Sequence, residues 1–233
     1  MYYYGNGVPQ SYQNAREWYR RAASQGYAEA QTALAFIYEQ GKGVIQSYRD
    51  AVTWYLKAAD QGNATAQNNL GYMYSHAEGV LQDYPTAVNW YSKAANQGDA
   101  TAQGNLGYMY LEAKGVPQDY SKAIEWFLKA SNQGNTCAQT SLGHMYEHGN
   151  GFAQNYSKAI EWYLKASNQG NASAQNNLGN LYSQGKGTSQ DYSEAFGWYL
   201  KEADQGYADA QFTIGSMYRD GKGVPENNNK PKK

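Results

Sequence analysis

The chain has 233 residues, of which 17% are charged, and its formal net charge is −1. This balance creates no large electrostatic field that would attract nucleic acid or an anionic membrane surface. Disorder is excluded because 15% of the residues are aromatic. No apolar run approaches the roughly 18–20 residues of a membrane-spanning helix, and the single Cys137 excludes an intrachain disulfide framework. We therefore expect a folded protein that neither binds nucleic acid nor inserts into a membrane.

One sequence unit recurs every 36 residues along the chain. Its tryptophan occurs six times in the same register, as Trp18, Trp54, Trp90, Trp126, Trp162 and Trp198. A Gln-Gly pair follows each tryptophan at a constant distance, first as Gln25-Gly26. A fixed period of about 20 to 50 residues is typical of solenoids, in which each unit buries its apolar face against its neighbours. The repeat therefore predicts one elongated all-α body rather than globular domains.

Residues 1–10 match the end of a later repeat helix and its turn, so we expect the chain to begin inside a repeat. The next helix is expected over residues 11–24. Six such helices begin at a residue whose side chain can accept from free helix amides: Ser11, Ser47, Asp83, Asp119, Asn155 and Asp191. Ser47 and Asp191 also have an acidic residue three positions later, which is the spacing of a capping box. Gly26 and its equivalents end these helices, because glycine readily adopts a positive φ.

A second helix follows each Gln-Gly pair after about two residues. Its N-caps in the inner units are Asn63, Asp99, Asn135 and Asn171. Five of these helices carry a central glycine, namely Gly71, Gly107, Gly143, Gly179 and Gly215. Glycine costs about 1 kcal/mol there relative to alanine, so we expect another backbone to approach closely. A Gly-x-Gly turn ends the helix, and Ala77 and Ala113 replace its first glycine twice.

These motifs resemble the Sel-one-like repeat (SLR) family, which is related to tetratricopeptide repeats. The resemblance rests on residues that recur in each unit, for example Ala66, Leu70, Gly71, Tyr74, Gly79 and Val80, then Ala87, Trp90, Tyr91, Lys93, Ala94 and Ala95. It covers residues 1–224 and implies a right-handed α-solenoid superhelix of antiparallel helix pairs with 36-residue repeats. The predicted solenoid spans 11–220.

In family order, five whole units run over residues 27–206. A lone helix at 11–24 precedes them and a lone helix at 208–220 follows them, so both terminal helices should be uncovered. Residues 221–233 are expected to form a turn and a disordered, basic tail. The uncovered ends raise the prospect of end-to-end self-association.

Function should lie where the repeats differ, because constant positions hold a solenoid together. The resemblance implies that the first helix of each unit lines a concave surface. The variable residues expected on that surface are Phe36, Asn68, Tyr72, His76, Tyr108, His144, His148, Asn176 and Asn180. Aromatic rings and amides suit a groove that holds a peptide. The alternative interpretation is that these solvated positions have drifted between near-identical copies.

Catalytic and metal-binding interpretations are weaker. His144 and His148 form a His-x-x-Glu-His string, but a metal site would need a third ligand, and Met145 and Tyr146 are ordinary core residues of the repeat. A basic column from Arg21 to Lys201 is partly neutralised by glutamates four residues earlier, which favours a solvated face. We therefore expect no metal and no cofactor.

Three functional hypotheses remain. The leading one is a non-catalytic interaction scaffold that presents a concave groove to a protein or peptide segment. The second is a binding module for a non-protein ligand such as a cell-wall glycan, because Tyr and Asn side chains can also contact sugar rings. The third, a hydrolase, is disfavoured because the sequence shows no pairing of a nucleophile with a base.

Overall fold

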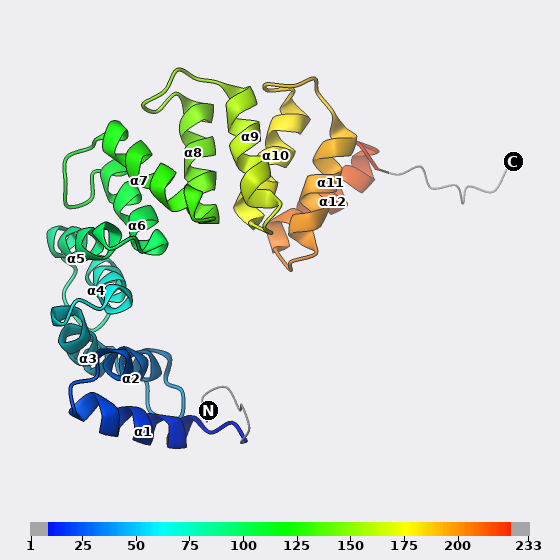
Figure 1. The fold of residues 1–233 in the computed structure, drawn as a ribbon. Coiled ribbons are helices and arrows are strands. Elements are labelled where there is room, and N and C mark those ends of the chain that lie inside the picture. Colours follow the sequence, from blue (N-terminus) through cyan, green and yellow to red (C-terminus); the bar gives the residue numbers. More distant parts are fainter. Residues whose placement is uncertain (1–8, 225–233) are drawn as a thin grey trace, which may run out of the picture. The chain divides into compact units, whose positions relative to one another are not determined.

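The computed structural model describes residues 9–224, which form twelve α-helices (Figure 1). They are α1 (Tyr12–Ser24), α2 (Ala28–Gln40), α3 (Tyr48–Asp60), α4 (Ala64–His76), α5 (Tyr84–Asn96), α6 (Ala100–Leu111), α7 (Tyr120–Asn132), α8 (Thr136–His148), α9 (Tyr156–Ser167), α10 (Ala172–Gln184), α11 (Tyr192–Ala203) and α12 (Ala208–Asp220). No strand occurs among these residues, so the predicted all-α class is confirmed. The expectations for residues 1–8 and for the tail 225–233 lie outside the described part.

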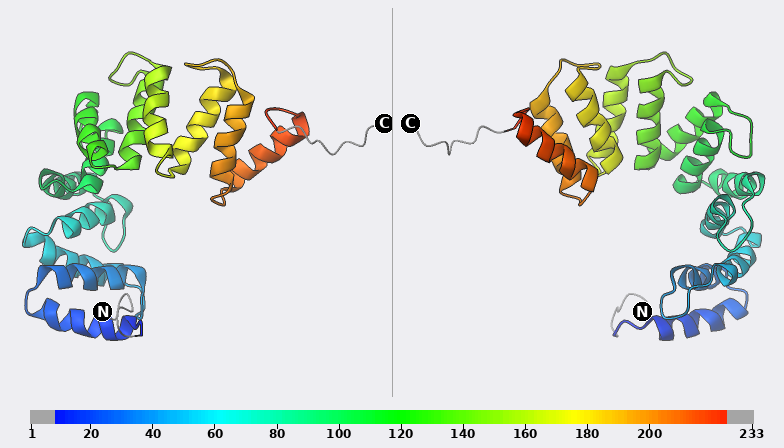
Figure 2. Two further views of the ribbon diagram at one scale, coloured as in Figure 1. Left: turned by 45° about the vertical axis from the view of Figure 1, so that its right-hand side comes forward. Right: turned by 180° about the vertical axis from the view of Figure 1, so that it is seen from behind.

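The helices form two compact units, one ending at Ala130 and the other beginning at Ser131. Within each unit, consecutive helices are joined by short turns and lie side by side as antiparallel pairs (Figures 1 and 2). These pairs confirm the solenoid architecture, while the handedness of the superhelix stays a prediction. Between residues 9 and 224, no helix is long and apolar enough to cross a membrane.

The predicted N-caps are confirmed at both kinds of helix. Ser11, for example, accepts from the amide of Asn14, and Asn63 accepts from the amide of Ala66. The proposed capping box is only half formed, because the amide of Ser47 donates to the Tyr38 carbonyl at 2.9 Å. The same bond ties every later cap of this kind to the preceding helix, from Asp83 to Tyr74, Asp119 to Tyr110, Asn155 to Tyr146 and Asp191 to Tyr182.

Four of the five central glycines receive aromatic rings, and not another backbone as we expected, while a Cβ added at Gly215 meets nothing within 4 Å. A Cβ added at Gly71 would lie 2.5 Å from the ring of Tyr91, which is 20 residues later. The same contact pairs Gly107 with Phe127, Gly143 with Tyr163 and Gly179 with Tyr199. Each ring is almost fully buried. The glycine is therefore needed because a bulky side chain of the next helix packs directly against the helix axis.

A buried glutamine couples each unit to the next. Gln67 is only 4% exposed, and its Nε2 donates to the Ala59 carbonyl at 3.1 Å. Its Oε1 accepts from Nε2 of Gln97 at 2.7 Å. The bond between glutamines recurs from Gln61 to Gln31, Gln169 to Gln139 and Gln205 to Gln175. Because a buried amide must be fully hydrogen-bonded, this column fixes the register of neighbouring units.

Three tyrosines at this repeat position hydrogen-bond to a residue 16 positions earlier, namely Tyr55, Tyr91 and Tyr163, whereas Tyr199 donates to Asn180. Tyr163 donates to Glu147 at 2.7 Å, and Tyr55, in the repeat where Ala35 replaces the central glycine, donates to Glu39 at 2.6 Å. In the unit where the ring is Phe127 and has no hydroxyl, the matched residue is Leu111. Burial and the neighbouring Glu147 both raise the pKa of Tyr163, so its hydroxyl stays protonated and donates.

This matching predicts energetic coupling between Glu147 and Tyr163. Tyr163→Phe and Glu147→Leu should each destabilise the protein by about 1–2 kcal/mol, because each leaves a partner group without its hydrogen bond. The double variant reproduces the apolar pair Leu111 and Phe127, so its loss should be smaller than the sum by about 1 kcal/mol or more. Urea unfolding of the four proteins measures the coupling, and strictly additive losses would refute the pairing.

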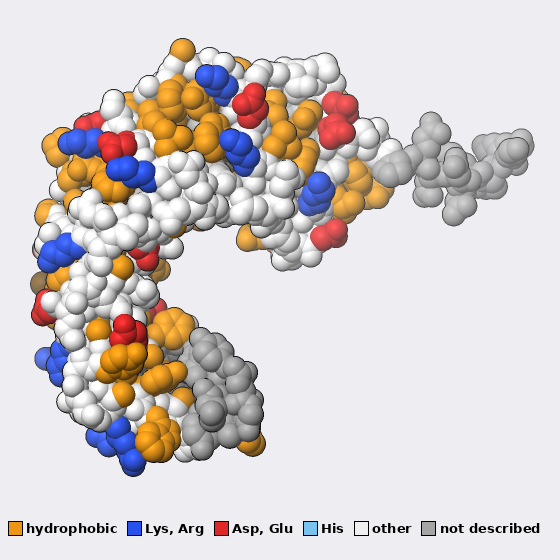
Figure 3. All heavy atoms as spheres, in the orientation of Figure 1, with side chains coloured by type: hydrophobic (Ala, Val, Ile, Leu, Met, Phe, Trp, Pro, Cys, Tyr) orange, Lys and Arg blue, Asp and Glu red, His pale blue; other side chains and the backbone are white. Residues whose placement is uncertain are grey.

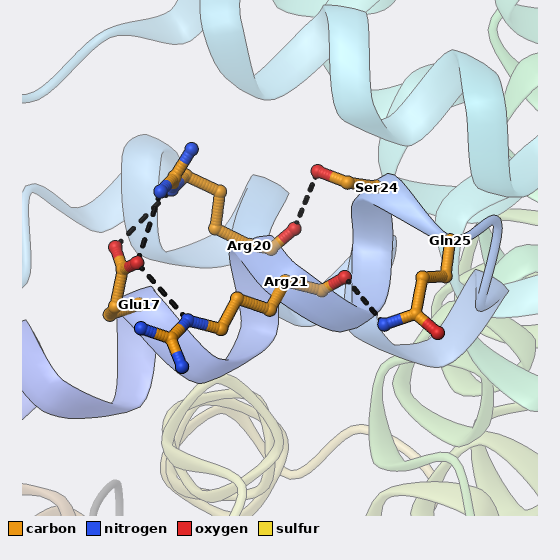
Figure 4. A network of polar contacts seen from close by, with 5 residues as sticks. All are labelled: Glu17, Arg20, Arg21, Ser24 and Gln25. Carbon is orange, nitrogen blue, oxygen red and sulfur yellow. Dashed lines mark hydrogen bonds and ion pairs between the residues drawn. The ribbon is translucent and has the colours of Figure 1, made fainter.

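The basic column from Arg21 to Lys201 lies over the repeated tryptophans. In α1, Arg21 lies over the Trp18 ring and pairs with Glu17, which also binds Arg20 (Figure 4). Five lysines lie 3.8–4.2 Å from the centres of tryptophan rings three residues earlier: Lys57, Lys93, Lys129, Lys165 and Lys201. On the face in Figure 3, basic side chains are scattered among polar and apolar ones. The stripe is thus a set of separate cation–π contacts.

Candidate binding site

A cavity of about 580 Å³ lies within the first compact unit, which ends at Ala130. It is bounded by α4, α5, α6 and the turns that follow α4 and α6. It is lined by Tyr72, Ser75, His76, Gln82, Tyr84, Tyr91, Asn105, Tyr108, Met109 and Lys114. Three of the residues expected on the variable surface, Tyr72, His76 and Tyr108, therefore meet in one site. Pockets of roughly 300–1,000 Å³ are typical of specific ligand sites.

Two tyrosines expose their rings at the mouth of this cavity. Tyr72 is 41% exposed and Tyr108 is 43% exposed. The His76 ring stacks on Tyr72, with ring centres 4.0 Å apart and planes inclined by 20°. Positions i and i+4 share one face of a helix, so α4 itself builds this stack. The result is a fixed aromatic wall that needs little ordering when a ligand arrives.

Lys114 supplies a cation to the same wall. Its Nζ donates to the Tyr108 hydroxyl at 3.2 Å and lies 4.8 Å from the centre of that ring. The Nζ atom also lies 5.8 Å from the centre of the Tyr84 ring. The bond to Tyr108 raises the pKa of Lys114, which keeps the ammonium charged. No Asp or Glu side chain lines the cavity, so the site presents a positive charge among aromatic and amide groups.

The floor of the cavity is polar but neutral. The Ser75 hydroxyl lies 3.3 Å from the Tyr91 hydroxyl, and Gln82 Nε2 donates to the Ser75 carbonyl at 2.9 Å. Burial raises the pKa of Tyr91 to about 12, so its hydroxyl is neutral at physiological pH. Asn105 Nδ2 donates to Asn68 Oδ1 at 3.0 Å, which places the predicted Asn68 beside the site as a support.

A serine and a histidine are in contact in this cavity. Ser75 Oγ lies 2.8 Å from His76 Nδ1, but Nδ1 also lies 3.0 Å from the Tyr72 carbonyl, which can only accept, so this contact requires Nδ1 to carry its hydrogen and not to act as a base toward Ser75. The same hydroxyl donates to the Tyr72 carbonyl at 2.8 Å, and Ser75 is only 8% exposed. With no carboxylate in the lining to orient the imidazole, the arrangement lacks the third group of a catalytic triad.

Both turns beside the cavity contain strained backbone. Ala77 has φ 60° and Ala113 has φ 54°, and they are the non-glycine residues with positive φ in the described part of the chain. Ala77 follows His76 and Ala113 precedes Lys114. Other units have glycine at this position, for example Gly41 and Gly185. Backbone strain of this kind clusters at functional sites.

Relief of this strain should stabilise the protein. Ala77→Gly and Ala113→Gly should each raise the free energy of unfolding by about 1 kcal/mol, because the left-handed conformation penalises a Cβ atom. Thermal or urea unfolding of the two variants tests this. As a control, Ala66→Gly in the buried start of α4 should destabilise the protein. A loss of stability in the turn variants would show that the left-handed alanines are not strained.

The other predicted residues do not join this cavity. Phe36 lines a separate space of about 240 Å³ with Tyr19 and Thr32, and Lys42 lies 5.2 Å from the centre of the Phe36 ring. In the second compact unit, which begins at Ser131, Asn176 and Asn180 belong to an internal network of hydrogen bonds. Asn180 donates to Asn176 at 3.0 Å, and Asn176 donates at 2.9 Å to Glu202, which is 7% exposed.

The two remaining histidines stack on each other. The rings of His144 and His148 have centres 4.0 Å apart, and His148 Nδ1 lies 3.0 Å from the His144 carbonyl. Parallel rings do not direct two nitrogen atoms at one ion. Among residues 9–224, no cluster of three or more His, Cys, Asp or Glu side chains could hold a metal. The pair instead forms a flat surface like that of Tyr72 and His76.

Sequence reasoning missed Lys114, Tyr84, Gln82 and Asn105 in the cavity. A signal for Lys114 was present, because the middle residue of the Gly-x-Gly turn varies between units: Lys42, Glu78, Lys114, Asn150, Lys186 and Lys222. The expected surface was confined to variable positions on the first helices. The turn folds back toward those helices, so its variable residue belongs to the same surface.

Comparison with known proteins identifies the repeat. The Sel1 repeat family model matches seven segments, 1–27, 28–63, 64–99, 100–135, 138–171, 172–207 and 208–230. No curated protein matches. A protective antigen of uropathogenic Escherichia coli with an SLR fold is 40% identical over 91% of this chain, with a TM-score of 0.81. The chain spans 45% of that protein's length.

Two further solved structures show the same fold. A Sel1 repeat protein from Oxalobacter formigenes is 34% identical, with a TM-score of 0.80 over 87% of this chain and 83% of its own. A putative Sel1 repeat protein from Klebsiella pneumoniae is 23% identical and has a TM-score of 0.59. That alignment covers 87% of this chain and 99% of the Klebsiella protein.

Proposed function

The chain belongs to the Sel1 repeat family, and we propose that it is a non-catalytic scaffold whose cavity around Tyr72, Tyr108 and Lys114 binds a segment of another protein. Sel1 repeats are commonly used for protein–protein interaction, and proteins built from them are generally non-catalytic. The observation that carries the proposal is the cavity itself, where variable residues of two adjacent units meet.

The lining favours a particular kind of segment. Tyrosine rings contribute large contact area with little loss of side-chain freedom, and the amides of Gln82 and Asn105 can bond to an extended backbone. No carboxylate lines the cavity beside the Lys114 ammonium, and the nearby Glu112 acts on it from outside the lining. A segment that places an acidic side chain next to an apolar or aromatic one would therefore fit the charge and the walls of the cavity.

Selection from a displayed library of random peptides tests the proposal. Peptides enriched on the protein should carry an acidic residue beside an apolar one. Tyr72→Ala and Tyr108→Ala should each weaken their binding about tenfold or more, since buried aromatic contacts dominate such interfaces. Lys114→Gln should weaken binding less in high salt than in low salt, because the charge contribution is screened. Fluorescence anisotropy measures the affinities.

A matched control and two competing outcomes define the result. Tyr27 is 61% exposed and lines none of the described cavities, so Tyr27→Ala should change the affinity less than about twofold. Equal losses in Tyr27→Ala and Tyr72→Ala would refute the cavity as the site. Soluble oligosaccharides that bind with the same sensitivity to Tyr72 would favour the glycan module. Ester hydrolysis abolished by Ser75→Ala would favour a hydrolase.

A further inference from the structure

The repeat junction before the Tyr72 cavity has the same construction and the opposite charge. Each lining residue of the cavity has an equivalent 36 residues earlier, and all of these equivalents belong to the first compact unit. Two glutamates, Glu39 and Glu78, stand where the cavity has Ser75 and Lys114. We call this set the acidic junction; it consists of Phe36, Glu39, Gln40, Gln46, Tyr48, Tyr55, Asn69, Tyr72, Met73 and Glu78. Tyr72 belongs to both sets.

The same hydrogen bond holds the backbone of both sets. In the acidic junction, Gln46 Nε2 donates to the Glu39 carbonyl at 2.7 Å. In the cavity, Gln82 Nε2 donates to the Ser75 carbonyl at 2.9 Å. The bond ties the segment that follows each Gly-x-Gly turn back to the helix before the turn. Because this framework is repeated, the two sets differ mainly in the charge that they present.

Both carboxylates of the acidic junction act on the Tyr72 ring. Burial raises the pKa of Tyr72, and the charges of Glu78 and Glu39 raise it further. Glu78 thus has the relation to Tyr72 that Lys114 has to Tyr108, where Nζ lies 4.8 Å from the ring centre. No ion pair within residues 9–224 includes either glutamate. The negative charge beside Tyr72 is therefore balanced by no described cation at ion-pair distance.

The acidic junction and the cavity are one repeat apart on one surface. Asn105 Nδ2 on α6 donates to Asn68 Oδ1 on α4 at 3.0 Å, so these two first helices lie side by side. The axes of packed helices are about 8–10 Å apart, and an extended chain covers about 3.3 Å per residue. An extended segment therefore passes from Glu78 to Lys114 in about three residues.

We propose that the segment bound at the Tyr72 cavity also carries a basic side chain, which pairs with Glu78 and Glu39 about three residues from the acidic side chain that meets Lys114. The pairing rests on the proposed function and sets the register of the bound segment. A shift by one repeat toward α6 would bring the basic side chain to Lys114. A shift the other way would bring the acidic side chain to Glu78. Like charges repel in both cases, so one position along near-identical repeats is favoured.

Peptide selection on the full chain tests the register. Peptides enriched from a displayed random library should carry lysine or arginine about three positions from the acidic residue. Selection on Glu78→Gln should keep the acidic residue and lose the enrichment of the basic one. Asp60→Asn is the matched control, because it also removes one carboxylate, and Asp60 is exposed at the opposite end of the α3–α4 pair. This control should enrich the same peptides as the unmodified chain.

Affinities of one enriched peptide measure the pairing directly. Glu78→Gln should weaken its binding about threefold, as expected for an exposed ion pair. Glutamine in place of the peptide's basic residue should weaken binding to the unmodified chain, and should matter clearly less on Glu78→Gln. On Glu78→Lys, a peptide with glutamate at that position should bind more tightly than the original peptide, because the charge is reversed. Fluorescence anisotropy gives the affinities, and circular dichroism checks that the variants keep their helical content.

The outcomes separate the register from the proposed function. Enriched peptides that pair an acidic with an apolar residue, but show no preference for a basic one, would overturn the register and leave the cavity as a binding site. Equal losses in Glu78→Gln and Asp60→Asn would overturn it too, because they would reflect net charge and not a local pair. A failure to enrich any peptide whose binding depends on Tyr72 would overturn both the register and the proposed function.

Discussion

Replacement of Gly79 by alanine should lower the free energy of unfolding by about 3 kcal/mol or more. Gly79 has φ 72°, where an L-residue loses about 1–2 kcal/mol. A Cβ there would also lie 2.5 Å from the carbonyl carbon of Tyr48 and 2.8 Å from the amide nitrogen of Arg49. These atoms belong to the first turn of α3, so relief of the clash requires a shift of the helix and not of a flexible side chain.

Gly98→Ala separates the conformational cost of a positive φ from the cost of the steric clash. Gly98 has φ 94°, but a Cβ there meets nothing within 4 Å. This variant should lose only the conformational part, about 1–2 kcal/mol. Guanidinium unfolding followed by circular dichroism measures both. If the two variants lose the same stability, the approach of the Gly-x-Gly turn to the preceding unit contributes nothing.

The local features of the fold were predictable from the sequence. Ser11, Asn63 and their equivalents are caps because a short polar side chain reaches an amide two or three residues later, and no distant residue is needed. The positive φ of Gly26 follows from the same local chemistry. The 36-residue period then copies each local result through the chain. This explains why helix positions agree closely with the predicted ones.

Contacts between helices were harder to predict. The sequence showed that Gly71 needs a close neighbour, but the identity of that neighbour depends on how α5 packs against α4. The capping box at Ser47 failed for the same reason, because the Tyr38 carbonyl of the preceding helix takes the Ser47 amide. Sequence spacing specifies what is near along one helix. It does not specify which atoms of the neighbouring helix arrive there.

The candidate site shows the same division. Tyr72 and Tyr108 were predicted, because variable aromatic positions 36 residues apart lie on one surface. The polar floor at Ser75 and Tyr91 was not predicted, since it depends on burial of a hydroxyl pair beneath that surface. Lys114 was missed because the path of its turn decides where the ammonium lies.

The scaffold also explains how near-identical units acquire different surfaces. Position 76 carries a histidine stacked on Tyr72, and position 148 carries a histidine stacked on His144. The helix presents both pairs in the same geometry, while their ring chemistry differs. Constant glycine–ring and glutamine–glutamine contacts hold the backbone, so single substitutions at the variable positions change the surface without a change in fold.

Gln67→Leu should test that constant framework with a loss of about 2 kcal/mol. Leucine has nearly the volume of glutamine, so the core stays filled. The loss arises because the buried Ala59 carbonyl loses its bond from Gln67, while the Gln97 amide is exposed and can bond to water instead. A buried group left unsatisfied in this way costs about 1–3 kcal/mol. Urea unfolding measures the change, and the helical content before unfolding should be unaltered.

Gln211→Leu is the control within the same column. Gln211 is exposed and donates to the Ala203 carbonyl. Water can replace this bond in the variant, so the expected loss is about 1 kcal/mol or less. The difference of about 1 kcal/mol between the two variants measures what burial adds to an otherwise identical hydrogen bond. Equal losses would mean that the glutamine column does not couple neighbouring units. In that case the register of the repeats would depend on the glycine–ring contacts alone.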